Sequence, residues 1–574
     1  MRVWLTALLL TVFLAHPVHG AVTDTIQASD FESSGISQAE AARFLNQATF
    51  GATLESIEQL RADGYRNWIR KQWGKRPSSH LAYLDALGLP ENQVWQLWRM
   101  GAWFTLAVTA EDQLRQRVAW ALSQIWVISD ESGYLHGRTR AMAHYYDLLL
   151  QQSAGNYRQL MEDITLNPLM GVYLSMFQNQ RANPDTGILP DENYAREIMQ
   201  LFSIGLVELN PDGTPVLDIN GQPVPTYGQD DIKALARVFT GWTRNGWDNG
   251  DGICAWWEFL YHGDDEGLLP MEPCEVTSPS VSASYNFHDT DAKVLFSSVN
   301  FPAGQDARQD LAMALDVLFN HPNVGPFIGK QLIQRLVTSN PSPAYVARVA
   351  AVFDDNGQGV RGDLAAVVEA ILLDDEARNG HLAQPNQFGK LREPLLRQTH
   401  LWRALGGVPQ RYDDYQDGNP EGVFGQAPLR APSVFNFYRP DYSPDGPLQA
   451  AGLLAPEFQI LGSATATSTA NRFWYLTLYN QGQWLGKPAD DLNWQTGVAL
   501  DLAPLAPLAA DVNTLLDRLD LVLLSGQMSA GMRSILAGYL NTLPYTEAGI
   551  PDGYSRVLEA VYLIITSPEY AVQR

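Results

Sequence analysis

The sequence predicts a mostly α-helical protein: a large multi-helical body with a small β-hairpin and an irregular, disulfide-tied insertion. Apolar residues recur at intervals of three and four along most of the chain, and residues that cap helices precede many of these runs. An Asn-Gly pair between two extended runs predicts the hairpin. The 574 residues are enough for a substantial core, and 45% hydrophobic with 18% charged residues excludes wholesale disorder.

The first twenty residues predict a secretory signal peptide. A basic start is followed by an apolar run at 3–15 and by small residues, so we expect cleavage between Gly20 and Ala21. The run is shorter than the roughly 20 residues that span a bilayer. No twin-arginine pair precedes it, which favours the general secretion route. We therefore expect a mature protein in the periplasm or the extracellular medium, without a transmembrane segment.

Helices are predicted by their caps and their apolar stripes. A capping box at 37–40 opens the first helix, and Thr53 caps a second that ends at Gly64. Further patterns lie at 140–152, 156–164, 191–206, 230–240, 306–319, 325–337, 343–353, 363–373, 390–405, 511–524, 530–541 and 553–566.

Between 208 and 300 the helical pattern breaks. The turn sequences at 210–213 and 220–221 predict the hairpin, and 244–284 is rich in Gly, Asp, Trp and Pro without a steady period. The two cysteines of the chain, Cys254 and Cys274, lie here. In an oxidising compartment they most simply form one disulfide.

The chain is thus divided into segments by composition. They are the signal peptide (1–20), an N-terminal helical part (21–207), the hairpin and insertion (208–300), a helical part (301–405), a stiff proline-rich ordered loop (406–450) and a C-terminal helical part (451–574).

Composition and missing motifs exclude several classes of function. With a formal net charge of −24, the protein has no general electrostatic footprint for nucleic acid. The chain contains no GxSxG elbow, HExxH helix, P-loop or complete EF-hand loop.

Two charged segments are candidates for chemistry. On the helix at 191–206, Glu192, Arg196 and Glu197 fall on one polar face, where they form either a solvated surface or the wall of a cleft. The second segment contains His288, with Asp289 and Lys293 close behind. A histidine beside carboxylates suits a metal or a proton relay, but the same pattern fits a capped turn.

Tryptophans are frequent, with 16 in the chain. The helical spacing of Trp95, Trp98 and Trp103 predicts core positions. The group in the irregular insertion is the candidate for a binding surface: Trp242, Trp247, Trp256 and Trp257.

Five ordered motifs resemble a bacterial family known as domain of unknown function 1800. They are ARFLNQATFG at 42–51, ENYARE at 192–197, ARVFTGW at 236–242, FHD at 287–289 with Lys293, and FNFYRPDY at 435–442. The resemblance implies one family domain over about 40–572 and an exported protein. It also implies a gene neighbour that encodes an exported sulfatase-like protein of the type called domain of unknown function 1501. The last motif adds Arg439, Asp441 and Tyr442 as binding candidates.

Two functions remain open at this point. We favour a binding or assembly protein that works with an exported partner, such as the sulfatase-like protein. The alternative is an extracytoplasmic, metal-dependent enzyme. Its catalytic candidates are Glu192, Arg196, Glu197, His288, Asp289 and Lys293, and its metal candidates, for a divalent ion, are Glu197, His288 and Asp289. We also expect the polar face of 191–206 to meet the His288 segment, with the 230–240 helix packed between them.

Overall fold

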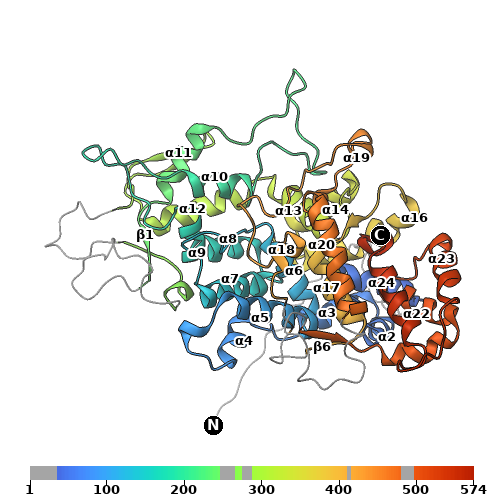
Figure 1. The fold of residues 1–574 in the computed structure, drawn as a ribbon. Helices are drawn as coiled ribbons and strands as arrows, with labels where there is room; N and C mark the ends of the chain where they lie inside the picture. Colours follow the sequence, from blue (N-terminus) through green and yellow to red (C-terminus); the bar gives the residue numbers. More distant parts are fainter. Residues whose placement is uncertain (1–34, 246–264, 275–286, 410–414, 416, 480–496) are drawn as a thin grey trace, which may run out of the picture.

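The structure is a computed structural model that describes residues 35–245, 265–274, 287–409, 415, 417–479 and 497–574. Helices dominate it (Figure 1). Those of the first half are α1 (Gln38–Ala48), α2 (Leu54–Asp63), α3 (Tyr65–Trp73), α4 (His80–Ala86), η1 (Glu91–Gln93), α5 (Gln96–Thr109), α6 (Gln113–Ser123), α7 (Thr139–Gln152), α8 (Tyr157–Thr165), α9 (Pro168–Tyr173), α10 (Asn193–Gln200), α11 (Gln229–Val238) and η2 (Asp265–Leu268).

The second half continues in the same way. Its helices are α12 (Ala307–Phe319), α13 (Val324–Leu336), α14 (Pro343–Asp354), α15 (Leu364–Leu373), α16 (Asp375–Ala383), α17 (Pro394–Ala404), α18 (Pro420–Phe424), α19 (Pro447–Ala450), η4 (Pro456–Gln459), α20 (Ser463–Trp474), the π-helical turn η5 (Tyr475–Tyr479), η7 (Ala503–Ala510), α22 (Val512–Leu524), α23 (Ala530–Leu540), α24 (Tyr554–Ile565) and α25 (Pro568–Ala571).

The strands of the described residues form small antiparallel pairs. The pairs are β1 (Trp242–Thr243) with β2 (Glu272–Pro273), β3 (Lys293–Leu295) with β4 (Val299–Phe301), β5 (Lys390–Leu391) with β8 (Val572–Gln573), and β6 (Gly407–Pro409) with β7 (Val498–Leu500). β3 and β4 form a local hairpin, whereas β5–β8 and β6–β7 join segments that are far apart in sequence. Because each pair is so short, the strands do not form a layer of their own.

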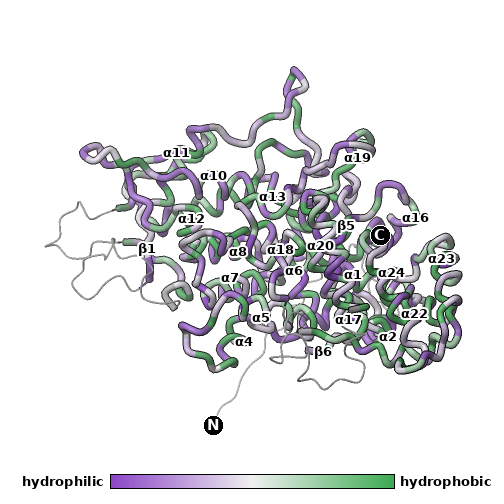
Figure 2. The backbone as a smooth tube through the Cα atoms, in the orientation of Figure 1, coloured by the Kyte–Doolittle hydropathy of each residue, from purple (hydrophilic) through white to green (hydrophobic). Residues whose placement is uncertain are grey.

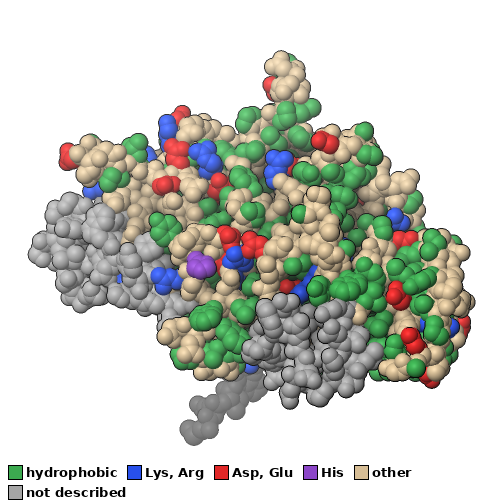
Figure 3. All heavy atoms as spheres, viewed as in Figure 1, with side chains coloured by type: hydrophobic (Ala, Val, Ile, Leu, Met, Phe, Trp, Pro, Cys, Tyr) green, Lys and Arg blue, Asp and Glu red, His purple; other side chains and the backbone are tan. Residues whose placement is uncertain are grey.

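A continuous hydrophobic core runs through the helical body from α1 to α25. Hydropathy changes every few residues along the helices, as amphipathic helices require (Figure 2). The face seen in Figure 3 carries interspersed acidic and basic side chains. Trp103 is buried as predicted, but Trp95 precedes the first turn of α5 and is 68% exposed, so its predicted core position is wrong.

The predicted caps of the first two helices are confirmed. Ser37 and Glu40 form the capping box of α1, and Thr53 caps α2, which ends at Gly64. The helix predicted at 191–206 ends earlier, at Gln200. Beyond it, a backbone hydrogen bond from the Phe202 N–H to the Glu197 carbonyl spans five residues instead of the four of an α-helix, and the chain then turns away.

The predicted hairpin is present as a thin arm over 207–225, which follows α10 and precedes α11 in sequence and rises at the top of Figure 1. Leu209 pairs with Pro215, and Leu217 pairs with Pro223. Gly221 has a left-handed φ of 74° but Asn220 does not, so the turn differs from the double left-handed type that Asn-Gly usually forms. Side-chain bonds explain the difference: the Asp218 carboxylate accepts the N–H groups of Asn220 and Gln222.

Several predictions concern residues outside those described: the signal peptide with Gly20 and Ala21, Cys254, Trp247, Trp256 and Trp257. Cys274 is described and buried, next to β2. The disulfide therefore stays a prediction. Within the described ranges, every helix is too short or too polar to span a bilayer.

Candidate functional site

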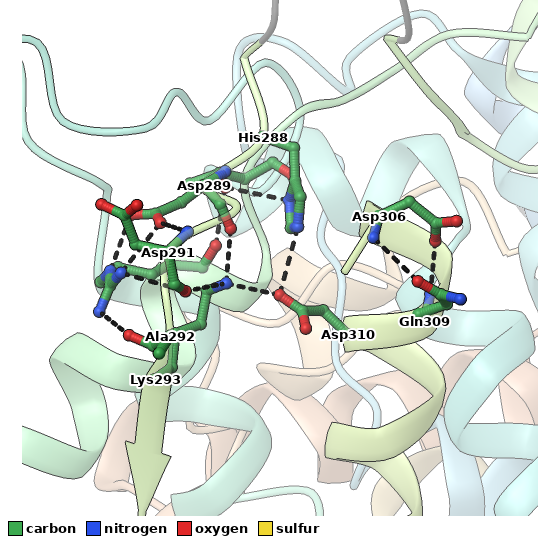
Figure 4. A network of polar contacts seen from close by, with 10 residues as sticks. His288, Asp289, Asp291, Ala292, Lys293, Asp306, Gln309 and Asp310 are labelled. Atoms are coloured by element: carbon green, nitrogen blue, oxygen red, sulfur yellow. Dashed lines mark hydrogen bonds and ion pairs between the residues drawn. The ribbon is translucent and has the colours of Figure 1, made fainter. Parts of the chain in front are cut away.

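The His288 segment lies where three elements meet. The loop after α11 contacts it through Thr240, β3 begins at Lys293, and α12 faces it with Asp310 (Figure 4). Gly241 permits this approach: its φ is 86°, and a Cβ there would stand 2.8 Å from the His288 backbone nitrogen. A capping box of Asp306 and Gln309 starts α12 and so places Asp310 in its first turn.

Asp310 is the centre of this cluster. Its fully buried Oδ2 accepts a hydrogen bond from Lys293 Nζ at 2.6 Å and lies 3.2 Å from His288 Nε2. The other ring nitrogen of His288, Nδ1, donates to the Thr240 carbonyl at 2.9 Å. Figure 4 shows the His288 and Lys293 side chains converging on the Asp310 carboxylate.

Asp289 is held separately, by Arg237. The guanidinium donates from Nε and Nη2 to the two carboxylate oxygens at 2.7 and 2.9 Å, a bidentate fork. Burial raises the pKa of Asp289, but the hydrogen bonds from Arg237 and the Asp291 N–H, together with the charges of Arg237 and Lys293, leave that pKa below its ordinary value. The bonds with Asp289 raise the pKa of Arg237.

The cluster is therefore a buried lock that joins α11, β3 and α12. Its charged side chains neutralise one another, and Lys293 is only 2% exposed. Among the described residues, no three or more His, Cys, Asp or Glu side chains are grouped so that they could hold a metal ion.

The sequence did not predict a role for Asp310, which looks like an ordinary acid in the first turn of a helix. Arg237 lies in the ARVFTGW motif, but the sequence alone predicts no role for it.

The charged residues of α10 divide between surface and interior. Glu192 and Arg196 form the expected i,i+4 pair at 3.2 Å, with side chains 31% and 40% exposed. Glu192 also accepts a hydrogen bond from Gln229 at the start of α11. This pair is a solvated one, and such pairs contribute little to stability.

Glu197 lies on the inner side of α10 and is only 5% exposed. Its Oε2 has no hydrogen-bond partner among the described residues. Burial raises its pKa, although Arg196 counteracts the effect. Burial also raises the pKa of Tyr173 and of Tyr227 to about 12, with a further contribution from the Glu197 charge.

The helix α11 packs against both α10 and β3, as expected for a helix between the two charged segments. The side-chain bonds of the His288 cluster, however, lead to Asp310 on α12. Glu197 has Tyr173 and Tyr227 as neighbours. A direct meeting of Glu197 with His288 stays a prediction.

Trp242 is not a surface residue, which corrects the prediction that it contributes to an exposed binding surface. It is 0% exposed, in β1, and the Arg308 guanidinium stands 5.9 Å from the ring centroid. The motif that contains Trp242 continues directly from α11, and this continuity buries the ring in the core.

A pocket of about 460 Å³ opens at the base of the arm, beside α13. Five segments that are far apart in sequence line it: Gln124 and Ile125 after α6, residues 200–215 from the end of α10 into the arm, one face of α13, residues 434–441, and Leu454. Gly205 has a φ of 72° and lies against α13, where a Cβ would stand 2.8 Å from the Phe327 ring. A glycine is thus required for this wall.

The FNFYRPDY segment forms one side of the pocket. Tyr438 donates to Gln124 Oε1 at 2.6 Å, and Gln334 Nε2 donates to the Pro440 carbonyl at 3.1 Å. Asn436 has a left-handed φ of 65°, which is costly for a residue other than glycine. The segment is thereby pinned to α6 and α13.

Two of the three binding candidates in this segment line the pocket. Arg439 and Asp441 line it, with 3.5 Å between Arg439 Nε and Asp441 Oδ1. Tyr442 does not line it; its carbonyl accepts the Ala455 N–H.

A second buried ionic network lies behind the pocket. The Arg335 carbonyl accepts hydrogen bonds from Arg117 at 2.6 Å and from Lys390 at 2.8 Å. Lys390 pairs with Glu457 at 2.8 Å, and both side chains are almost completely buried. Sequence reasoning found neither this network nor the pocket, because their members come from separate segments without a local pattern.

A smaller hollow of about 290 Å³ lies near residue 574 and is lined by Arg43 and Arg392, among others. Both guanidiniums are already used by the fold: Arg43 donates to the Ala377 carbonyl, and Arg392 donates to the Tyr570 carbonyl. Because the hollow is also smaller than the pocket beside α13, it is the weaker candidate.

The comparisons with known proteins agree with the resemblance of the motifs. No curated protein and no solved structure matches the chain. One family model matches residues 43–572, nearly the whole chain, under the description "protein of unknown function". The chain therefore belongs to the DUF1800 family.

Proposed function

We propose that this protein is an exported binding protein and that the pocket beside α13 is its binding site. The observation that carries the proposal is the pocket itself. Its volume falls within the roughly 300–1,000 Å³ of typical ligand sites, and one of its walls is the FNFYRPDY segment. The locked His288 cluster supports a binding role, since Asp289 and Lys293 are engaged in holding the fold.

Export is supported by the leader at 1–20. We propose that the mature chain begins at Ala21, that it resides in the periplasm or outside the cell, and that Cys254 and Cys274 are joined. The mass of the exported protein tests all but its compartment: it should lack residues 1–20 and two thiol hydrogens. A mass that retains the leader, or two titratable thiols, would contradict the proposal.

The partner that the family resemblance implies, an exported sulfatase-like protein, is proposed as the protein with which this one works. Co-purification of the two proteins tests this role. The comparison is the Leu206→Trp variant, in which a larger side chain fills the pocket. Equal recovery of the partner with both forms would place the contact outside the pocket.

A second candidate function, an extracytoplasmic enzyme, is favoured by Glu197, a buried carboxyl group whose Oε2 has no partner among the described residues. Metal analysis of the purified protein separates the two functions. Stoichiometric zinc, manganese or calcium would favour the enzyme, whereas a binding protein requires none.

A neutral fluorescent probe, N-phenyl-1-naphthylamine, tests the pocket directly. We expect saturable binding by the wild type and at least a tenfold loss of affinity in Leu206→Trp, because the larger ring fills the mouth of the pocket. Leu217→Trp is a matched control. Both leucines are 56% exposed, but Leu217 lies on the arm and does not line the pocket. Equal affinities of the two variants would refute the proposal.

A further inference from the structure

The side chains of the pocket change in character along α13. Phe327, Lys330, Gln331, Gln334 and Arg335 all line it, at the spacing of one helix face. The face begins with an aromatic ring and ends with a guanidinium. Phe327 and Arg335 are eight residues apart, so they lie about 12 Å apart along the axis, and Lys330 lies between them.

The apolar part of the wall comes from both sides of Phe327. The segment after α10 contributes Leu201, Leu206 and Val207. The segment at 434–441 contributes Val434 and Phe435. Phe435 is 45% exposed, which is high for so large an apolar side chain. This part of the pocket suits a hydrocarbon or aromatic body.

The charged part is cationic. Lys330, Arg335 and Arg439 line the pocket against one acid, Asp441, although the whole chain carries a net charge of −24. Burial lowers the pKa of Lys330, and Asp441 opposes this only in part. A local excess of cations on an acidic protein attracts anions and repels cationic ligands.

Two buried donors in the lining have no acceptor among the described residues. They are Asn436 Nδ2 and Arg335 Nε, in side chains that are 7% and 2% exposed. Buried donors are normally satisfied, and leaving one unsatisfied is costly. A ligand rich in acceptors would satisfy donors of this kind.

We propose that the pocket binds an amphiphilic organic oxyanion, with its carboxylate, sulfate or phosphate head at Lys330, Arg335 and Asn436 and its apolar body against Phe327 and Phe435. This proposal rests on the binding function proposed above and names its ligand class. Lys330 supplies the charge, and Asn436 supplies a neutral donor to the same head group. The apolar body provides the area that the hydrophobic effect acts on.

Two probes of one scaffold test the head group. The sulfonate 8-anilinonaphthalene-1-sulfonate carries the anion, and N-phenyl-1-naphthylamine lacks it. We expect Lys330→Met to weaken the binding of the sulfonate about tenfold, the usual effect of one charge-assisted hydrogen bond. It should leave the affinity for the neutral probe within about twofold.

The control is Lys233→Met, which removes the same charge from the exposed surface of α11. It should change neither affinity. Asn436→Gly is the second variant: glycine accepts the left-handed backbone without strain, so only the amide is lost. It should weaken the binding of the sulfonate and spare the neutral probe.

Competition then identifies the head group. Decanoate, decyl sulfate and decyl phosphate should displace the sulfonate probe, each to the degree that its head fits, and decanol should not. The ligand class is overturned if decanol competes as well as the anions, or if Lys330→Met weakens both probes equally or neither. Those results leave the pocket intact as a binding site. A failure of Leu206→Trp to affect either probe would instead overturn the proposed function.

Discussion

Replacing Asp310 by Asn tests whether the His288 cluster is a structural lock. The substitution keeps the shape of the side chain but removes the charge that faces Lys293 at 2.6 Å. Because the two side chains are 0% and 1% exposed, the Lys293 ammonium would be left buried without a counter-charge. Removing one partner of a buried pair costs about 3–5 kcal/mol.

The cost corresponds to a measurable shift in melting temperature. At roughly 2.1 cal/mol/K per residue, the unfolding entropy of a chain of this length is about 1.2 kcal/mol/K. Asp310→Asn should therefore lower the melting temperature by about 2.5–4 °C, measured by far-ultraviolet circular dichroism at neutral pH. Asp316→Asn is the control on the same helix. Its carboxylate is 63% exposed and pairs with Arg158, so its loss should cost about 0–1 kcal/mol.

A double variant, Lys293→Met with Asp310→Leu, completes the test. Well-packed apolar residues of similar volume often replace a buried ion pair without loss of stability. The double variant should therefore melt above Asp310→Asn. The reasoning is refuted if Asp310→Asn melts with the Asp316→Asn control, or if the double variant is the least stable of the three.

Three further predictions concern charge and backbone. Glu197→Gln should stabilise the protein at neutral pH relative to the wild type. Because the pKa of Glu197 is raised, its contribution to stability is complete below the unfolded value near 4.3 and is lost as pH rises. The difference in melting temperature between variant and wild type should therefore grow from pH 4 upwards. A difference that is independent of pH would contradict this. Asp289→Asn should show the opposite sign, because the lowered pKa of Asp289 gives stability above about pH 4 that is lost as pH falls; the melting temperatures of wild type and variant should converge in acid. Gly205→Ala should cost about 1–3 kcal/mol in denaturant titrations, and more than Gly187→Ala, whose φ of 75° is similar but whose surroundings are open; equal costs would show that contact with Phe327 is unimportant.

The sequence predicted the helices well where the signals are local. The capping boxes at Ser37 and Thr53 and the glycine at 64 lie within one helix each, so propensity and spacing are sufficient to place α1 and α2. The end of α10 was placed too late, since the polar and apolar periodicity continues past Gln200 although the backbone bonding does not.

The sites were harder to predict because they depend on tertiary contacts. The motif at 287–289 indicated the right segment, but the partner that defines its role, Asp310, lies on another helix and is an unremarkable acid in sequence. The pocket beside α13 is assembled from residues between Gln124 and Leu454. Among the predicted binding residues that the structure describes, Arg439 and Asp441 line it, and the family resemblance, not a local pattern, had indicated them.

The pairing of β5 with β8 brings the segment around Gln573 against the end of α13. Gln573 in β8 donates to the carbonyls of Leu336 and Val337 at the end of α13, the helix that carries the cationic end of the pocket. This contact joins residues more than 230 positions apart in sequence. Such long-range contacts form late in folding, because the entropy of closing the loop must be overcome first. A chain that is still being synthesised lacks this support, so we expect the pocket beside α13 to be fully formed only after the whole segment to Gln573 has emerged and folded.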